Sequence, residues 1–300
     1  MNKMVLEYNV EPYEMGDPNS KTGCLLFHGY TGSPIDMFPI AKICEKYDWH
    51  IKVPRLPGHG IPIDHLIKTK HTEWLIAAEK EYVAFAKNKE RIILGGHSLG
   101  NVLIFHLDVK YRKENKISNL LSISPPVIIK KRWMLPFIDI AKIFVRKIDY
   151  SVIAFKDKRI MKHPLYNYLR STYKEYPLGI IKELVKAVNY GIKLIPLLRT
   201  DVLVMFGKED DVVDPKSGYE ILIKAKSKHK ALVMFEGMHV PMLDIDYKEF
   251  QKVLISYFNE ISNKKLNVED NTFDIFNLFD EVAKKTNIDL AKSKLHLLSQ

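Results

Sequence analysis

A serine between two glycines is the first candidate for chemistry in this chain. Ser98 lies in the segment Gly96-His97-Ser98-Leu99-Gly100, between an apolar run at 92–94 and a second one at 102–107. This order predicts a strand, a sharp turn and a helix, which is the context of a nucleophile elbow. Such a turn strains the serine backbone, and glycine on either side avoids a collision of side chains. A G-x-S-x-G segment also occurs by chance, so the prediction needs further residues.

Two later loops contain the partners that a serine nucleophile requires. A serine hydroxyl reacts poorly at neutral pH unless an imidazole takes its proton, and a carboxylate must orient that imidazole. The loop 208–215 contains Asp210, Asp211 and Asp214, and the loop 236–241 contains His239. Each loop follows a predicted strand, and the order serine, acid, histidine is that of the elbow architecture. The chain holds eleven histidines, but chance rarely places one in this particular loop.

Alternating apolar runs and amphipathic segments predict the elements that hold these loops. Helices are expected from Pro34 onward and at 72–87, 215–225 and 247–261. Strands are expected at 4–10, 23–27, 50–54, 92–94, 117–124, 201–207 and 231–235. This alternation predicts an α/β fold with a mostly parallel sheet covered by helices on both faces.

Three regions follow from the same pattern. Residues 1–126 and 199–264 form the predicted core, and residues 127–198 form a cap inserted into it. The cap shows helical periodicity at 138–147 and more clearly at 180–194. Residues 265–300 are expected to form a helical extension of two amphipathic helices. These helices either pack on the core or dock a partner, and packing is the simpler expectation.

The net charge of +10 is concentrated in the predicted cap. Between Pro125 and Thr200 there are 16 Lys and Arg against 5 Asp and Glu, a balance of +11. This excess is either a solvated, lysine-rich surface or a face that contacts anionic lipid or an acidic substrate. No recognised nucleic-acid-binding motif accompanies it, so nucleic acid is not an expected partner.

Apolar length and cysteine content predict a cytoplasmic, reducing location. The first residues contain no apolar run of signal-peptide length, and no segment has the uninterrupted apolar length of a membrane span. Cys24 and Cys44 are too few for a disulfide framework, and Cys24 lies in a strand-like apolar run, which indicates a core position.

The chain resembles the α/β hydrolases of the monoacylglycerol lipase and bacterial carboxylesterase branch. The resemblance covers roughly residues 20–262, and its five motifs follow the order and spacing of that family. They are Leu26-Phe27-His28-Gly29-Tyr30-Thr31-Gly32, Leu56-Pro57-Gly58-His59-Gly60, Gly96-His97-Ser98-Leu99-Gly100, Gly207-Lys208-Glu209-Asp210 and Gly237-Met238-His239. The resemblance implies an α/β-hydrolase fold and an enzyme that requires neither a metal nor a cofactor.

The motifs assign roles to particular residues. By resemblance, Ser98 is the nucleophile, His239 is the general base and acid, and Asp210 is the triad acid. Asp211 is the alternative acid, because spacing alone does not separate adjacent carboxylates, whereas Asp214 precedes Pro215 and is expected to start the next helix. The backbone N–H groups of Tyr30 and Leu99 are the expected oxyanion-hole donors.

Several neighbouring polar residues are expected to be structural. The histidines of the matching motifs, at positions 28, 59 and 97, fall in this group, because the triad already has its base. Asn101 stands where many relatives carry a second glycine, and we expect a local packing adjustment there with no loss of activity.

The resulting functional expectation is a serine esterase or lipase, that is, a carboxylesterase or monoacylglycerol lipase-like hydrolase. It would cleave a carboxylic ester (a monoacylglycerol, a lysophospholipid or a similar acyl ester) through an acyl-enzyme. A thioesterase or acyltransferase would use the same triad, and a non-catalytic binding relative is a third alternative. The oligomeric state is left open. Apolar residues of the cap either line an acyl pocket or bury the cap against the core; they are Ile138, Phe144, Ile153, Phe155, Ile180, Ile181 and Leu184.

Overall fold

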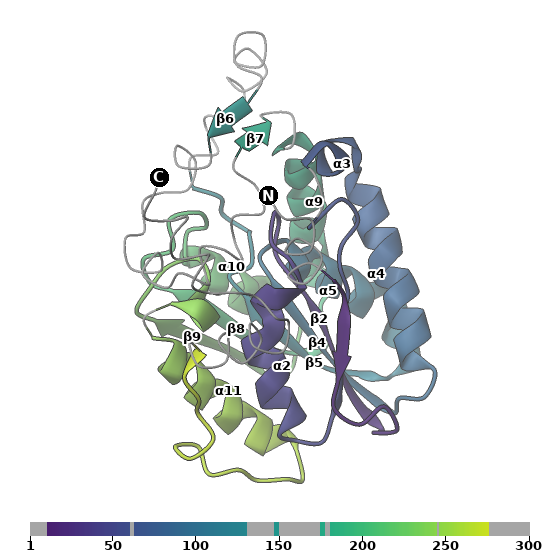
Figure 1. Cartoon of the computed structure of the whole chain (residues 1–300), viewed down its shortest axis with the longest axis vertical. Coiled ribbons are helices and arrows are strands. Elements are labelled where there is room, and N and C mark those ends of the chain that lie inside the picture. Colours follow the sequence, from purple (N-terminus) through teal and green to yellow (C-terminus); the bar gives the residue numbers. More distant parts are fainter. Residues whose placement is uncertain are drawn as a thin grey trace, which may run out of the picture.

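The computed structural model describes residues 11–60, 63–130, 181–244 and 246–275, and the backbone of 147–149 and 175–177. Seven strands form one sheet in the order β1-β3-β2-β4-β5-β8-β9 (Figure 1). Only β1, which pairs with β3, is antiparallel to its neighbour. The predicted mostly parallel α/β sheet is therefore confirmed. The strands are β1 (Tyr13–Met15), β2 (Thr22–Phe27), β3 (His50–Val53), β4 (Arg91–His97), β5 (Ile117–Ile123), β8 (Asp201–Gly207) and β9 (Lys230–Phe235).

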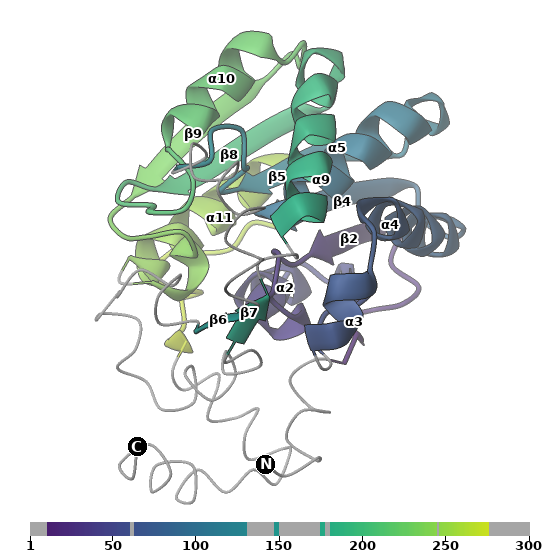
Figure 2. The same ribbon diagram turned by 90° about the horizontal axis from the view of Figure 1, so that it is seen from above.

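Helices cover both faces of the sheet (Figure 2). One face packs against α2 (Phe38–Glu45) and α11 (Tyr247–Ile261), and the other against α4 (His71–Ala86), α5 (Leu99–Tyr111), α9 (Ile181–Leu194) and α10 (Lys216–Lys224). Strand β2 shows why both faces are apolar: Cys24 and Leu26 join the first core, whereas Leu25 and Phe27 join the second. Alternate side chains of a strand point to opposite faces, so a central strand covered on both sides has to be apolar throughout.

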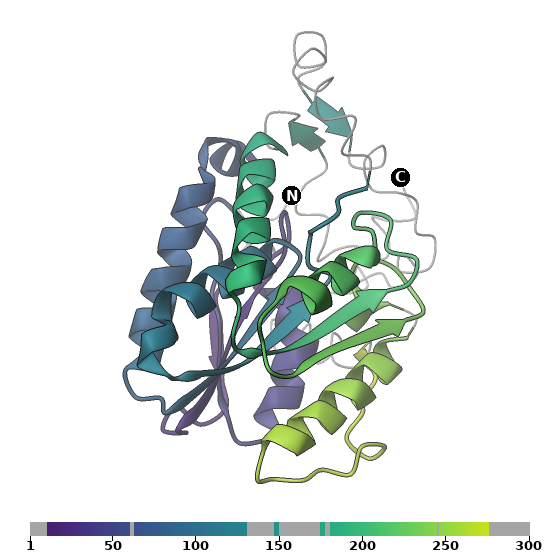
Figure 3. The ribbon, with the colours of Figure 1, turned by 180° about the vertical axis from the view of Figure 1, so that it is seen from behind.

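Helix α5, which carries the serine segment at its start, is enclosed almost completely. Residues 99–108 are all buried, and α9 packs directly on this helix. Gly191 of α9 permits the close approach, because a Cβ there would lie 2.9 Å from a methyl carbon of Val102. Helix α9 also runs beside α4 (Figure 3), where the Glu183 carboxylate accepts hydrogen bonds from the backbone N–H and the Nδ1 of His71. The core therefore holds in place the helix that begins directly after Ser98.

The structure adjusts several predicted elements. The strand expected at 4–10 lies outside the described residues, and the described edge strand is β1, with only three residues. The helix expected from Pro34 begins as a 3₁₀ turn (Pro34–Met37), and the short α3 (Ile63–Lys68) had no clear periodicity in the sequence. Cys24 and Cys44 are buried and free, with 3.5 Å between their sulfur atoms, as expected for core positions.

Only parts of the predicted cap and extension are described. The helix expected at 180–194 is confirmed as α9. Most of the periodic segment 138–147 lies outside the described residues, and Lys147 itself belongs to a strand, β6 (Lys147–Asp149), which pairs with β7 (Glu175–Pro177). From the extension, Ile275 is buried in the core beside α11, and the two expected helices fall outside the description. The division into core, cap and extension remains a prediction.

None of the described helices combines the length with the apolar character that a bilayer-spanning helix needs.

Candidate active site

Ser98 lies in a strained turn between β4 and α5. Its backbone has φ 50° and ψ −114°, a conformation that residues other than glycine rarely adopt. A Cβ at Gly96 would lie 2.5 Å from the carbonyl carbon of Gly100, and one at Gly100 would lie 2.3 Å from the carbonyl oxygen of Phe27. The Ser98 N–H donates to the Ile123 carbonyl of the neighbouring strand at 2.9 Å. The predicted elbow is present, and both glycines are required for it.

Asp210 and His239 meet beyond the carboxyl ends of β8 and β9. The His239 Nδ1 lies 2.7 Å from Asp210 Oδ2, and the Asp210 side chain is fully buried. The other carboxylate oxygen, Oδ1, accepts the backbone N–H groups of Val212 and Val213 at 2.9 and 2.8 Å. Because an ionised carboxylate only accepts, Nδ1 carries the proton and Nε2 is left as the basic nitrogen.

Of the three aspartates in the acidic loop, Asp210 lies with its carboxylate against the His239 imidazole. Asp211 is partly exposed, whereas Asp210 makes the contact with the imidazole. Asp214 instead accepts the backbone N–H of Lys216 at 2.9 Å, at the start of α10, as expected.

His97 links the serine segment to the histidine loop. Its Nε2 lies 2.9 Å from the His239 carbonyl oxygen and donates to it, since a carbonyl can only accept. The two imidazole rings are 5.1 Å apart between centroids. Within the loop, Gly237 has φ 126° and the Met238 N–H donates to the Asp244 carboxylate. The residue next to the nucleophile thus braces the backbone of the candidate base, a structural role as predicted for His97.

The loop after β2 approaches the serine closely. A Cβ at Gly29 would lie 3.3 Å from the Ser98 Cβ, so the absence of a side chain allows this approach. The Gly29 carbonyl lies 2.9 Å from His28 Nδ1 and accepts the Gly32 N–H at 3.1 Å. In a trans peptide the C=O and the next N–H point in opposite directions, so the Tyr30 N–H is turned away from these donors. This orientation suits a backbone donor that serves an oxyanion.

The buried imidazoles of His28 and His59 pack against this loop. The Leu56 N–H donates to His28 Nε2 at 3.1 Å, so His28 is neutral, with its proton on Nδ1. Burial lowers the pKa of His28 to about 4, and burial together with the neighbouring His28 lowers that of His59 to about 3. Both rings lie in one aromatic cluster with Tyr30 and Trp74. The predicted structural role of His28 and His59 agrees with these contacts.

The first residues of the predicted cap are attached to the acidic loop. Ile129 forms a bridge with Val213, and the Lys130 N–H donates to the Val212 carbonyl at 2.9 Å. The Lys130 Nζ lies 2.5 Å from the Asp210 carbonyl oxygen. Sequence reasoning missed this role of Lys130, because the partner lies 80 residues away.

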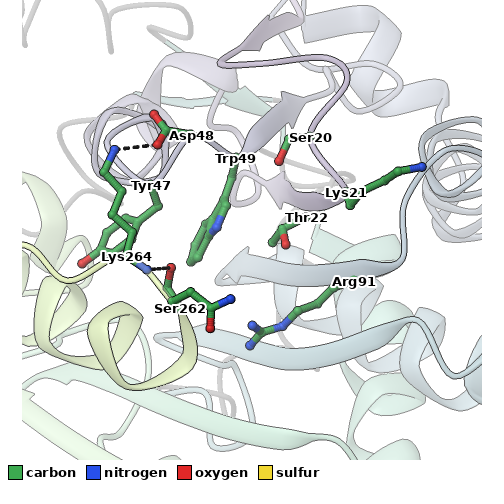
Figure 4. Close-up of a pocket in the computed structure, with 10 residues that line it drawn as sticks. Ser20, Lys21, Thr22, Tyr47, Asp48, Trp49, Arg91, Ser262 and Lys264 are labelled. Carbon is green, nitrogen blue, oxygen red and sulfur yellow. Dashed lines mark hydrogen bonds and ion pairs between the residues drawn. The ribbon is translucent and has the colours of Figure 1, made fainter.

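A cavity of about 380 Å³ lies at the opposite, amino-terminal edge of the sheet (Figure 4). The Arg91 guanidinium beside it is held by Ser118 Oγ and Asn119 Oδ1, each at 3.0 Å, and by the Ile261 carbonyl. Thr22 and Arg91 are the first residues of β2 and β4, whereas Ser98 follows the last residue of β4. The full length of these strands therefore separates the cavity from Ser98. It is therefore no part of the site formed by Ser98, Asp210 and His239. Its lining consists of Ser20, Lys21, Thr22, Tyr47, Asp48, Trp49, Arg91, Ser262, Asn263 and Lys264.

Among the described residues, no three His, Cys, Asp or Glu side chains are grouped in a way that suits a metal ion. Of the apolar cap residues expected to line a pocket, Ile181 and Leu184 are described, and they pack partly buried against the α5 side of the core. The other five lie outside the described residues.

A parallel sheet with an elbow serine and an Asp–His pair at its carboxyl edge defines the α/β-hydrolase class of proteins. The sequence matches the family described as serine aminopeptidase, S33, over residues 18–246. The chain belongs to this family of hydrolases. Together with the relatives described next, this match confirms the resemblance to the α/β hydrolases of the monoacylglycerol lipase and carboxylesterase branch.

Named relatives agree with this placement. A thermostable monoacylglycerol lipase from Bacillus sp. (strain H-257) is 33% identical over 89 residues, which cover 30% of this chain and 36% of that lipase. A carboxylesterase from Bacillus subtilis (strain 168) is 21% identical over 223 residues, 73% of this chain and 85% of that enzyme. The predicted enzyme class, carboxylic ester hydrolase, agrees with the names of these relatives.

A solved structure agrees on the fold. It comes from work on the metagenome-derived lipolytic enzymes LipS and LipT, and it superposes with a TM-score of 0.71 over 84% of this chain and 98% of the other. At 19% identity, this similarity establishes the α/β-hydrolase fold alone.

Proposed function

We propose that this chain hydrolyses carboxylic esters through an acyl-enzyme on Ser98. The observation that carries the proposal is the buried Asp210–His239 pair at the same sheet edge as a serine held at φ 50°. A basic Nε2 on His239 suits proton transfer from the Ser98 hydroxyl. A non-catalytic binding protein would not require this combination of strain, burial and tautomer.

The proposed reaction has two steps. The Ser98 oxygen attacks the ester carbonyl while His239 takes its proton, and the N–H groups of Tyr30 and Leu99 stabilise the tetrahedral oxyanion. When the intermediate collapses, His239 protonates the departing alcohol and leaves an acyl-serine. Water then attacks the acyl carbon while His239 takes its proton, and His239 returns this proton to the Ser98 oxygen as the bond to the acyl group breaks and the acid leaves. Asp210 stabilises the imidazolium in both steps.

We further propose that the substrate carries a single medium or long acyl chain, as in a monoacylglycerol or a lysophospholipid. Support comes from the relative named as a monoacylglycerol lipase and from the apolar and basic composition of residues 127–198. The positive charge of that segment suits anionic lipid, so hydrolysis should be faster on vesicles that contain phosphatidylglycerol than on phosphatidylcholine alone. Thioester cleavage or acyl transfer would use the same residues with a different leaving group or acceptor.

The test is hydrolysis of p-nitrophenyl esters of increasing acyl length by the wild type, Ser98→Ala and Ser227→Ala. Ser227 is a matched control, because it is also buried but lies ahead of β9 at the other sheet edge. We expect Ser98→Ala to lose at least about 1000-fold in kcat and Ser227→Ala to keep its rate. The chain-length optimum then sizes the acyl pocket.

Parallel substrates separate the alternatives. Acyl-thioesters, an added alcohol acceptor and an aminoacyl p-nitroanilide distinguish a thioesterase, an acyltransferase and an aminopeptidase from an esterase. A wild type that turns over none of the esters would refute the proposal.

A further inference from the structure

The buried side chain of Asn101 binds the backbone of the serine segment. Its Nδ2 lies 3.1 Å from the Ser98 carbonyl oxygen and 2.7 Å from the Ile123 carbonyl oxygen, and its Oδ1 accepts the Ser122 hydroxyl at 2.6 Å. Both carbonyls can only accept, so the NH₂ group must face them, and the orientation of the amide is fixed. Asn101 is fully buried, and its carboxamide is bonded at both ends.

These contacts hold Ser98 from two sides. The Ile123 carbonyl that receives the Asn101 amide also accepts the Ser98 N–H at 2.9 Å. The Ser98 carbonyl accepts both the side chain and the backbone N–H of Asn101, the latter at 3.0 Å. A residue at φ 50° persists in that conformation only when its surroundings over-determine it. Asn101 supplies two of the bonds that do so.

The Ser98 carbonyl also fixes the direction of a second group. It shares a peptide unit with the Leu99 N–H, and in a trans peptide the two point in opposite directions. With the carbonyl held by Asn101, the Leu99 N–H is turned toward the opposite side, as the Tyr30 N–H is when the Gly29 carbonyl is held by His28 and Gly32. Each expected oxyanion donor therefore belongs to a peptide whose carbonyl is bonded twice.

We propose that Asn101 is a positioning residue for catalysis, which aims the Leu99 N–H at the oxyanion through its bonds to Ser98 and Ile123. This inference rests on the proposed function, in which Leu99 is an oxyanion donor. Asn101 acts through the backbone and touches no substrate atom. A glycine at this position would leave the Ser98 carbonyl with one donor fewer and the Ile123 carbonyl without its side-chain partner.

The experiment compares Asn101→Ala with Asn119→Ala. Asn119 is a buried asparagine near the amino end of β5, where it donates to the Tyr257 hydroxyl at 2.8 Å and accepts from Arg91. Both variants remove a buried, bonded carboxamide, so both should lower the unfolding temperature. Only Asn101→Ala should lower kcat, by about 10-fold to 100-fold with KM within about threefold, because the lost interaction acts in the transition state.

A second readout separates positioning from general destabilisation. A trifluoromethyl ketone of matched chain length adds to the serine, and the resulting oxyanion occupies the oxyanion hole. Its affinity should fall in Asn101→Ala by the same factor as kcat, whereas binding of the fatty-acid product should hardly change. Ser122→Ala keeps both N–H donors and should lose less than Asn101→Ala. Should the alanine variant fail to fold, Asn101→Gly carries the same comparison.

The outcomes keep the two proposals apart. Unchanged kcat and ketone affinity in a folded Asn101 variant of an active, Ser98-dependent enzyme would overturn the positioning role alone. A wild type that neither hydrolyses esters nor reacts at Ser98 with a fluorophosphonate would overturn the proposed function and this inference with it.

Discussion

The strands β8 and β9 carry an Asp–His pair at each end, and the two pairs have the same contact distance. At the carboxyl ends, His239 Nδ1 lies 2.7 Å from Asp210 Oδ2, and at the amino ends His229 Nδ1 lies 2.7 Å from Asp201 Oδ2. Their surroundings differ, because the side chains of His239 and Asp210 are 15% and 0% exposed, against 68% and 36% for His229 and Asp201.

The difference teaches that a hydrogen bond between the two residue types does not define a catalytic pair. Asp210 is fixed by two further backbone N–H groups and shares its sheet edge with the strained Ser98. Asp201 instead accepts the backbone N–H of His229 itself, and both side chains are open to water, which weakens their interaction. The exposed pair joins two strand ends, whereas the buried pair holds an imidazole in one tautomer.

The largest expected effect separates these two pairs directly. Asp210→Asn should lower kcat by about 10⁴-fold, because an amide no longer enforces the Nδ1–H tautomer of His239. Asp201→Asn should keep kcat within about twofold and lower the free energy of unfolding by about 1 kcal/mol or less. Steady-state ester hydrolysis and urea unfolding measure both quantities. A similar kcat loss in both variants would remove the distinction, and Asp211→Asn checks the alternative acid.

A smaller effect is expected from glycines at the two ends of β2. In Gly29→Ala the new methyl group would lie 2.8 Å from His97 Nδ1 and 3.3 Å from Ser98 Cβ, so kcat should fall by about 10-fold to 100-fold. In Gly23→Ala the methyl group would lie 2.5 Å from the Phe85 ring, so the free energy of unfolding should fall by about 1–3 kcal/mol at unchanged kcat. Kinetics and thermal unfolding of both variants test this contrast, and equal kcat in the two variants would contradict it.

The remaining prediction concerns acid stability and the buried, neutral imidazoles of His28 and His59 next to the oxyanion loop. The folded pKa values of about 4 for His28 and about 3 for His59 lie below the value of about 6.5 in an unfolded chain, which therefore binds more protons as the pH falls. Each histidine should lower the free energy of unfolding by about 1.4 kcal/mol per pH unit, from pH 6.5 down to its folded pKa.

Urea unfolding of the wild type and His59→Asn between pH 7 and 4.5 measures this dependence. The asparagine amide can replace the Nδ1–H bond of His59 to the Pro57 carbonyl but does not titrate. The free energy of unfolding of the variant should depend less steeply on pH, by the contribution of one histidine. An unchanged pH dependence would show that His59 does not contribute to it.

The sequence predicts those site residues whose position follows from their order along the chain and from their place directly after a strand. Ser98, the acidic loop and His239 follow three strands of a parallel sheet, whose carboxyl ends necessarily share one edge. The same logic predicted β8, β9 and α11 closely. The same reasoning did not predict β1 or α3. These elements have three and six residues, which is too short for a clear periodic pattern of apolar side chains.

Other parts of the site depend on tertiary contacts that no local pattern contains. Asp210 is preferred to Asp211 because the chain turns the N–H groups of Val212 and Val213 toward its carboxylate. Asn101 reads as a packing change until Ile123, 22 positions away, is seen beside it. The sequence signal that could have indicated such a bond is an asparagine among the otherwise apolar residues that follow Ser98.

The contacts of residues 128–130 with the acidic loop have a consequence for recombining this chain with its relatives. A transplant cut at 127 and 198 would remove the Ile129–Val213 bridge and the Lys130 bond to the Asp210 carbonyl, and it would also remove α9 from its packing on α5. A cut after 130 and before 181 keeps all three within the host. The segment exchanged in this way is shorter than the predicted cap, and the host retains the residues that contact its acidic loop.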